Sequence, residues 1–358
     1  MFLNMIFASS SAIVHETDIP NQNQYMFEKE YLTFLPELIK VYDIPGLSLA
    51  RISDKKIVTF ECGVKNRISR DPVTSSTVFE AASLSKPLIA YAALELCEKG
   101  LLEMDQPLST YLTSPESNDT FLSVVTLRHV LSHTGGFPTA NLKPGKSLKL
   151  EFYPGSQFAY SGESFCYLGR VIEQITGDCL ASYMQEHVLT PLKMNNSSFI
   201  WKKNYIAQAA SPHDQKGLPT EKWKPVKAIA SFSLHTTASD YAKFMIIARR
   251  FSVMSEIQVQ INKEIGWGLG WGIEITPEGS SSWHSGDNGT FQCLAFQNEQ
   301  TGFVIMTNSA NGMKIYRHIF DLLISGEHPL FDWEQFDSRA EEKLDDEFLA
   351  NWWKIYEL

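Results

Sequence analysis

The sequence predicts an α+β protein, in which strands from both ends of the chain join one mainly antiparallel sheet beside a helical subdomain. Two observations predict this fold class. Patterns typical of strands occur at residues 46–63 and again within 266–308, whereas most of the stretch between them has helical periodicity. The chain of 358 residues also contains no internal repeat and no low-complexity linker, which argues against two tandem domains. Its 44% hydrophobic residues suffice for a sizeable core without disulfides.

The first expected strands form a hairpin over residues 46–63, where two β runs flank a polar turn at 53–56. A helix is expected from Ser83 to Lys99, with Pro87 in its first turn and Gly100 as its C-cap. Further helices are expected at 126–133, 163–176, 178–188, 238–250 and 313–325. Later strands are expected at 266–275, 290–298 and 302–308, with a turn, Asn-Glu-Gln-Thr-Gly, between the last two.

Charge, hydropathy and cysteine content limit which binding partners, membrane spans, disulfides and metal sites the protein can have. Lys and Arg number 31 against 41 Asp and Glu, so the net charge of −10 argues against nucleic acid and anionic membrane surfaces. No apolar run is long enough to span a bilayer. The five cysteines are odd in number and lack C-x-x-C spacing, which excludes a disulfide framework and a Cys-rich zinc site. Four of them lie in apolar surroundings and are expected to be buried free thiols.

The two ends of the chain carry separate signals. Residues 1–14 are similar to the back half of a signal peptide, but no Lys or Arg occurs before Lys29. A signal remnant would make the protein periplasmic or secreted, and otherwise we expect it to be cytoplasmic. Near the other end, apolar residues at a spacing of three to four predict an amphipathic helical tail within 326–358. The oligomeric state is not predicted.

A candidate nucleophile lies in the S-x-x-K pattern Ser83-Leu84-Ser85-Lys86. On a helix, Lys86 shares a face with Ser83. A lysine in an apolar pocket can lose its charge and take the hydroxyl proton, which activates a weak serine nucleophile. A second match, Ser53 to Lys56, lies in a polar turn where the lysine would be solvated. The structural alternative makes Ser83 an N-cap and Lys86 a surface residue.

Two further segments contain candidate site residues. Tyr160-Ser161-Gly162 lies in a turn before an expected helix, where a tyrosine can act as a general base or simply pack on the core. His284-Ser285-Gly286 lies at an expected strand start, where small residues would let a substrate lie along the edge. The alternative is an edge strand with an exposed histidine. The backbone N–H groups of Ser83 and Asp287 could form an oxyanion hole.

His129 and His133 have the i, i+4 spacing of helical metal ligands. The zinc signature H-E-x-x-H needs Glu after the first histidine, and here that residue is Val130. We therefore favour a structural interpretation, in which His133 holds the loop that follows. A zinc hydrolase remains an alternative, but no metal and no cofactor are expected.

Taken together, six segments in this order resemble the serine β-lactamase-related family. That family includes class C β-lactamases, low-molecular-weight penicillin-binding proteins, D-aminopeptidases and related carboxylesterases. The similarity covers roughly residues 30–325. The segments are ASLSKPLIAYAALELCEKGLLEMDQPLSTYL, TLRHVLSHTGGFP, YPGSQFAYSGESFCYLGRVIEQITG, HTTASDYAKFM, WGLGWGI and WHSGDNGTF.

The resemblance implies a β-lactamase/DD-peptidase-like fold, with an active site between the sheet and an all-helical subdomain. It also implies roles: Ser83 is acylated, Lys86 is its proton partner and Tyr160 acts as base and then acid. His284-Ser285-Gly286 would take the place of the K-T-G motif, and Tyr160 or His284 would help water to release the acyl group. Ser161, Gly162, Ser285 and Gly286 would contact the substrate. The implied boundaries are an N-terminal segment at 1–25, a hydrolase domain at 26–325 (α/β part about 26–82 and 262–325, helical part about 83–261) and a tail at 326–358.

Two departures from the family pattern bear on the substrate. Gly162 replaces the Y-x-N asparagine, so amide recognition loses a hydrogen bond worth on the order of 1 kcal/mol. His284 replaces the lysine of K-T-G and is expected to be partly charged near neutral pH. We therefore rank esterase or DD-peptidase/D-aminopeptidase-like activity on a small-molecule, peptide or ester substrate above β-lactamase activity. A catalytically impaired penicillin-binding sensor or scaffold is the alternative from another class.

Overall fold

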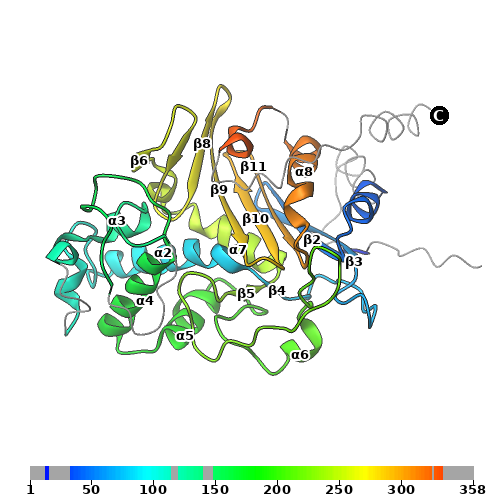
Figure 1. The fold of residues 1–358 in the computed structure, drawn as a ribbon, viewed down its shortest axis with the longest axis horizontal. Helices are drawn as coiled ribbons and strands as arrows, with labels where there is room; N and C mark the ends of the chain where they lie inside the picture. The colour runs from blue at the N-terminus through cyan, green and yellow to red at the C-terminus, as the bar shows by residue number, and fades with distance from the viewer. Residues whose placement is uncertain (1–12, 16–32, 114–119, 140–147, 325, 334–358) are drawn as a thin grey trace, which may run out of the picture.

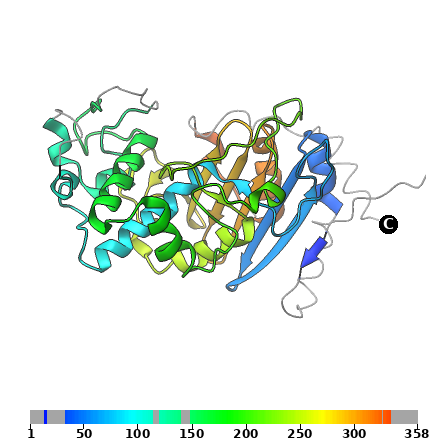
Figure 2. The same cartoon turned by 90° about the horizontal axis from the view of Figure 1, so that it is seen from below.

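The computed structural model describes residues 13–15, 33–113, 120–139, 148–324 and 326–333, and Figures 1 and 2 show it as a ribbon. Within these residues the strands form one nine-stranded antiparallel sheet in the order β1-β3-β2-β11-β10-β9-β8-β7-β6. The strands are β1 Ile13–His15, β2 Gly46–Ser53, β3 Lys56–Gly63, β6 Val259–Gln260, β7 Ile265–Trp267, β8 Gly272–Thr276, β9 Gly279–Asp287, β10 Gln292–Gln297 and β11 Thr301–Thr307. β4 Phe79–Glu80 and β5 His235–Thr236 pair separately. The expected joining of early and late strands is confirmed, since β2 pairs with β11.

Helices fill the middle of the chain, as the periodicity predicted. The helices are α2 Ser85–Glu98, α3 Leu127–Leu131, α4 Gly162–Thr176, α5 Leu180–Tyr183, α6 Tyr205–Gln208, α7 Ala238–Ala248 and α8 Tyr316–Leu323, and residues 33–41 are also helical. Shorter helical turns include η1 Ala82–Leu84, η4 Met184–Leu189, η6 Gly312–Ile315 and η7 Pro329–Asp332. Gly100 and Gly177 follow α2 and α4 with positive φ angles of 68° and 76°, as expected of helix-ending glycines.

The sheet separates two hydrophobic clusters. On one face, Ala50 and Val304 belong to a cluster that extends through α2, α4 and α7, so the sheet and the helical part share one core. On the other face, Leu49 and Phe303 pack with α8 and with residues 33–41. Figure 1 shows α7 and α8 on opposite sides of the strands. The strands therefore alternate between two buried faces.

Several expectations need correction. The stretch 266–275 is two strands rather than one, because the chain turns between β7 and β8 at Gly270, where φ is 85°. His284-Ser285-Gly286 lies near the end of β9 and not at a strand start. The cysteines are free, but Cys97 and Cys166 are only half-buried and Cys179 is exposed. Only Cys62 and Cys293 are buried, rather than the four expected.

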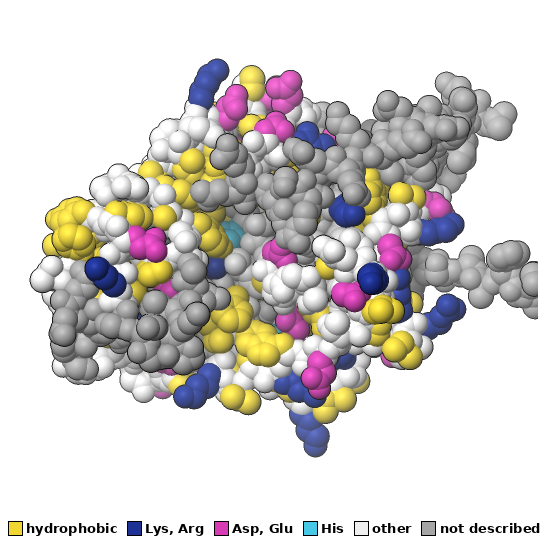
Figure 3. All heavy atoms as spheres, in the orientation of Figure 1, with side chains coloured by type: hydrophobic (Ala, Val, Ile, Leu, Met, Phe, Trp, Pro, Cys, Tyr) yellow, Lys and Arg dark blue, Asp and Glu magenta, His cyan; other side chains and the backbone are white. Residues whose placement is uncertain are grey.

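Other expectations are only partly covered by the described residues. The signal remnant within 1–25 lies outside them except for β1, and the C-terminal tail lies outside them beyond residue 333. The domain boundaries stay predictions. Within the described part of the chain, no helix is long and apolar enough to cross a membrane. On the face shown in Figure 3, Lys and Arg side chains of the described residues are scattered among acidic ones.

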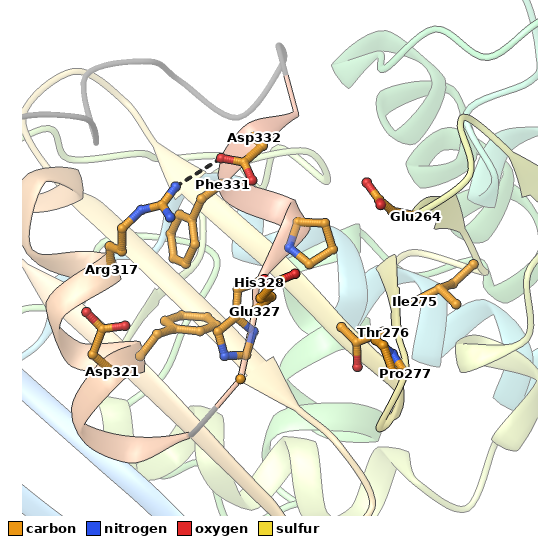
Figure 4. A pocket seen from close by; sticks show the side chains of 13 residues that line it. Glu264, Ile275, Thr276, Pro277, Arg317, Asp321, Glu327, His328, Phe331 and Asp332 are labelled. Carbon is orange, nitrogen blue, oxygen red and sulfur yellow. Dashed lines mark hydrogen bonds and ion pairs between the residues drawn. The ribbon is translucent and has the colours of Figure 1, made fainter.

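A buried contact between a histidine and a carboxyl group ties the end of the described chain to the sheet. The Nδ1 atom of His328 lies 2.9 Å from the Oε1 atom of Glu274 on β8, and the Glu274 side chain has no exposed surface. The His328 ring packs edge-on against Phe296 and Phe320. Figure 4 shows His328 in the segment that also carries Asp332, which pairs with Arg317 of α8. Removing one partner of such a pair leaves a buried polar group without its hydrogen bond.

We predict that His328→Ala lowers the free energy of unfolding by about 3 kcal/mol or more, because Glu274 would stay buried without its partner. Urea unfolding at pH 7 measures this loss. His318→Ala is the matched control, since His318 of α8 bonds the neutral hydroxyl of Tyr42 and should cost only about 1 kcal/mol. Equal losses in the two variants would contradict the prediction.

Candidate active site

Ser83 lies in a sharp turn immediately before α2. The turn is η1, and Ala82 within it has a φ angle of 45°, in the left-handed region that L residues other than glycine rarely adopt. That conformation costs about 1–2 kcal/mol, which the surrounding contacts must offset. Ser83 is half-buried, and its side chain sits beside the first turn of α2. Strain of this kind is concentrated at functional sites.

Neighbouring side chains hold this turn in place. The Ser85 hydroxyl donates to the Ala82 carbonyl at 2.7 Å and accepts the Leu234 N–H at 2.9 Å. The Tyr241 hydroxyl donates to the Leu84 carbonyl at 3.0 Å. All of these groups are buried, so water does not compete for the hydrogen bonds. The strained turn is therefore fixed from the segment before β5 and from α7.

Lys86 is buried against Ser83. Only 2% of the residue is exposed, and its Nζ atom lies 2.9 Å from the Ser83 Oγ atom and 2.9 Å from the Ser231 carbonyl oxygen. Among the described residues, no carboxylate forms an ion pair with Lys86. The expected S-x-x-K contact is thus present, and the surface-lysine alternative is wrong. The other match differs, because Ser53 ends β2 at an exposed position.

Tyr160 lies next to the same amine. The Lys86 Nζ atom is 4.8 Å from the centroid of the Tyr160 ring, which is half-buried just before α4. The Tyr160 ring centroid lies 4.3 Å from that of His133, 5.7 Å from that of Trp267 and 6.0 Å from that of His284. The structure therefore brings together three of the four expected catalytic side chains around one point, with His284 adjoining them.

The end of β9 packs directly against the nucleophile turn. A Cβ atom on Gly286 would lie 2.2 Å from the Ala81 carbonyl oxygen, so any larger residue there would displace the strand or the turn. Ser285 is half-buried and Asp287, the last residue of β9, is exposed. This close approach brings the end of β9 beside η1.

His284 does not act as the partly charged group that the sequence predicted. Its imidazole is 1% exposed, and its Nδ1–H donates to the Ser285 carbonyl at 2.8 Å. Burial, reinforced by the positive charge of Lys86, lowers the pKa of His284 to about 3. The ring is neutral near pH 7, so both the partly charged group and the exposed edge histidine are corrected.

The Ser161 side chain differs from the expectation that it binds substrate. Ser161 is 1% exposed, and its hydroxyl donates to the Pro138 carbonyl at 2.6 Å. The serine side chain is therefore used internally, which corrects its assignment. Gly162 is the first residue of α4 and is half-buried.

The two histidines with metal-like spacing hold backbone groups. The Nδ1 atom of His129 accepts the Thr126 N–H at 3.2 Å as part of the cap of α3. The Nδ1 atom of His133 accepts the Ser161 N–H at 3.1 Å. The structural interpretation, in which His133 holds the following loop, is confirmed. The described residues show no group of three or more His, Cys, Asp or Glu placed to hold a metal.

Sequence reasoning missed Ser231, which supplies a carbonyl oxygen to Lys86. Its hydroxyl lies 3.3 Å from the Cys166 sulfur, so α4 also contacts this part of the site. A backbone acceptor has no side-chain signature in the sequence. Tyr241 was likewise missed, since a tyrosine in an apolar helix is typical of core packing.

Comparison with known proteins identifies the family. A family model described as Beta-lactamase matches residues 33–325. The chain is 27% identical over 219 residues to a beta-lactamase from Pseudomonas fluorescens, covering 58% of this chain and 61% of the relative. It is 30% identical over 167 residues to esterase EstB from Burkholderia gladioli, covering 38% of this chain and 42% of the esterase. The chain thus spans about half the length of the curated relatives it matches.

The fold is likewise that of solved structures. One is D-alanine carboxypeptidase AmpC from Burkholderia cenocepacia, with a TM-score of 0.72, 20% identity and coverage of 84% of this chain and 100% of that one. A class C beta-lactamase aligns with a TM-score of 0.75 and 18% identity, covering 87% of this chain and 100% of the beta-lactamase chain. The expected β-lactamase/DD-peptidase-like fold is confirmed. Because the family model extends over most of the sequence, the chain belongs to the beta-lactamase family.

Proposed function

We propose that the protein is a serine hydrolase that works through an acyl-enzyme on Ser83. The observation that carries this proposal is the 2.9 Å contact between the buried Lys86 amine and the Ser83 hydroxyl. A serine becomes an effective nucleophile when a neighbouring base removes its proton as it attacks. In its amine form, Lys86 can accept that proton through the contact already present.

Acylation then proceeds in one sequence of bond changes. The Ser83 oxygen attacks the substrate carbonyl carbon while Lys86 and Tyr160, whose ring lies beside the same amine, together take its proton. The N–H groups of Ser83 and Asp287 are proposed to hold the oxyanion, since Gly286 brings β9 against η1. Each such donor is worth about 10²–10³ in rate. As the tetrahedral intermediate collapses, Tyr160 returns that proton to the leaving group, and Ser83 remains acylated.

Hydrolysis of the acyl-enzyme by water also needs a general base. We assign this step to Tyr160, because it is half-buried next to Lys86 whereas the His284 ring is almost fully buried. The water gives one proton to Tyr160 as it attacks the acyl carbonyl. When the bond from the acyl carbon to Ser83 breaks, the proton passes through Tyr160 and Lys86 to the Ser83 oxygen, and the carboxylic acid leaves. General acid–base catalysis of this kind contributes typically about 10²–10⁴ in rate. His284 is proposed to take the K-T-G position as a neutral neighbour of Tyr160.

Two residues, Gly162 and His284, indicate the substrate class. Gly162 at the start of α4 has no side chain to hydrogen-bond an acylamide carbonyl, and the neutral His284 offers no charge to a substrate carboxylate. We therefore place esters first, with DD-peptidase- or D-aminopeptidase-like activity next and β-lactam hydrolysis after them. The relatives named beta-lactamase and esterase are compatible with this range. A penicillin-binding sensor remains the second candidate, favoured by the same glycine.

We predict that wild-type protein gains one covalent adduct from a fluorophosphonate or an activated ester and that Ser83→Ala gains none. Intact-mass analysis after each reagent, and after a penicillin, measures this. The matched control is Ser53→Ala, which alters the other S-x-x-K match at an exposed position and should label like wild type. Labelling of Ser83→Ala at the wild-type rate would contradict the proposal.

The same experiment separates the two candidate functions. Rapid turnover of the ester after a transient adduct identifies a hydrolase. A stable penicillin adduct with very slow release, and no turnover of esters, identifies the sensor instead.

We predict that Gly162→Asn shifts the preference from esters toward amides. A restored side-chain donor is worth on the order of 1 kcal/mol, so the ratio of kcat/KM for an amide to that for its matched ester should rise about five- to tenfold. Gly162→Ala is the control, because it adds a Cβ atom without a donor. An unchanged ratio in Gly162→Asn, or an equal change in Gly162→Ala, would disprove this explanation of the missing asparagine.

A further inference from the structure

His133 makes three contacts that converge on Tyr160. Its carbonyl oxygen accepts the Ala159 N–H at 2.9 Å, and its Nδ1 atom accepts the Ser161 N–H at 3.1 Å. Its ring lies against the Tyr160 ring at 4.3 Å between centroids and a tilt of 34°. The residues before and after Tyr160 are therefore held by the same histidine that packs on its side chain.

The backbone of His133 is itself constrained. Its φ angle is 55°, in the left-handed region, and the residue is only 1% exposed. Histidine is among the residues that adopt this conformation more often than most, but it still costs free energy. Because α3 ends at Leu131, this reversal of the chain turns both acceptors of His133 toward the Tyr160 segment.

The hydrogen bond from Ser161 determines the tautomer of the His133 ring. A backbone N–H can only donate, so Nδ1 carries a lone pair and the proton of the neutral ring lies on Nε2. Burial, with the nearby charge of Lys86 and the neighbouring His284, holds the pKa of His133 well below its usual range. The ring therefore stays neutral and keeps its acceptor at physiological pH.

We propose that His133 is a positioning residue, which holds the Tyr160 phenol in place beside the Lys86 amine. The inference rests on the proposed function, since it concerns the base of that reaction. Any residue at position 133 would offer its carbonyl oxygen to the Ala159 N–H, whereas the acceptor of the Ser161 N–H is the histidine side chain itself. A histidine that only filled the core would not need this second bond, which holds the chain on the other side of Tyr160. Displacing a catalytic group by about 1 Å can cost about 10²-fold in rate.

Three variants separate the contributions of the ring and of the acceptor. His133→Ala removes the ring contact and the Nδ1 acceptor. His133→Phe keeps a ring against Tyr160 but has no acceptor. His133→Asn places an amide oxygen the same number of bonds from the backbone as Nδ1, and asparagine tolerates a positive φ angle. The matched control is His129→Asn, because His129 caps α3 through the same atom without contacting Tyr160.

One readout is the rate at which a fluorophosphonate labels Ser83, and the others are kcat and KM for an activated ester. Each is measured at a temperature at which a thermal unfolding curve shows that the variant is folded. We expect His133→Ala to lower labelling and kcat about 10²-fold with KM changed less than about threefold. His133→Asn should recover about tenfold of that loss and His133→Phe less. His129→Asn should match wild type.

The inference is overturned if folded His133→Ala labels at the wild-type rate, or if the loss lies in KM alone. It is also overturned if His133→Asn, which keeps the acceptor, is no better than His133→Ala. Failure of the proposed function has a different signature: in that case wild type itself is not labelled on Ser83, and both conclusions fall together.

Discussion

The site is built around one buried amine. Lys86 is shared between the Ser83 hydroxyl and the Ser231 carbonyl, and no carboxylate of the described residues neutralises it. A buried amine without a counter-ion can be stabilised only by acceptors of this kind or by losing its proton. The centroids of the Tyr160 and Phe165 rings lie 4.8 and 5.9 Å from its Nζ atom, so aromatic side chains enclose the rest of the amine.

Backbone constraints place the partners of that amine. Ala82 turns the chain through a left-handed conformation into α2, and Gly286 lets β9 approach the same turn at a distance that no side chain would allow. His133 imposes a third constraint on the segment of Tyr160. Each constraint lies on a different part of the chain, so the site exists only when the sheet and the helical part share their core. Local strain is thereby offset by packing of the whole domain.

Much of this arrangement could be predicted from sequence, for identifiable reasons. The hairpin of β2 and β3, the long helices α2, α4 and α7, and the pairing of Ser83 with Lys86 follow from periodicity, from glycine at helix ends and from i, i+3 geometry. The division between β7 and β8 was missed because its turn is flanked by aromatic residues that are typical of strands. Ser231 was missed because it contributes a carbonyl. The charge of His284 was mispredicted because burial, which lowers its pKa, has no local sequence signal.

The central claim is that Lys86 is the base that activates Ser83. The most direct measurement is the second-order rate constant for labelling of Ser83 by a fluorophosphonate in Lys86→Met, compared with wild type at the same pH. Methionine keeps an unbranched chain of similar length in the buried site but has no amine. The account predicts a rate about 10²–10⁴ lower in a protein that remains folded. Labelling at the wild-type rate would contradict it and leave Ser83 to be activated by another group.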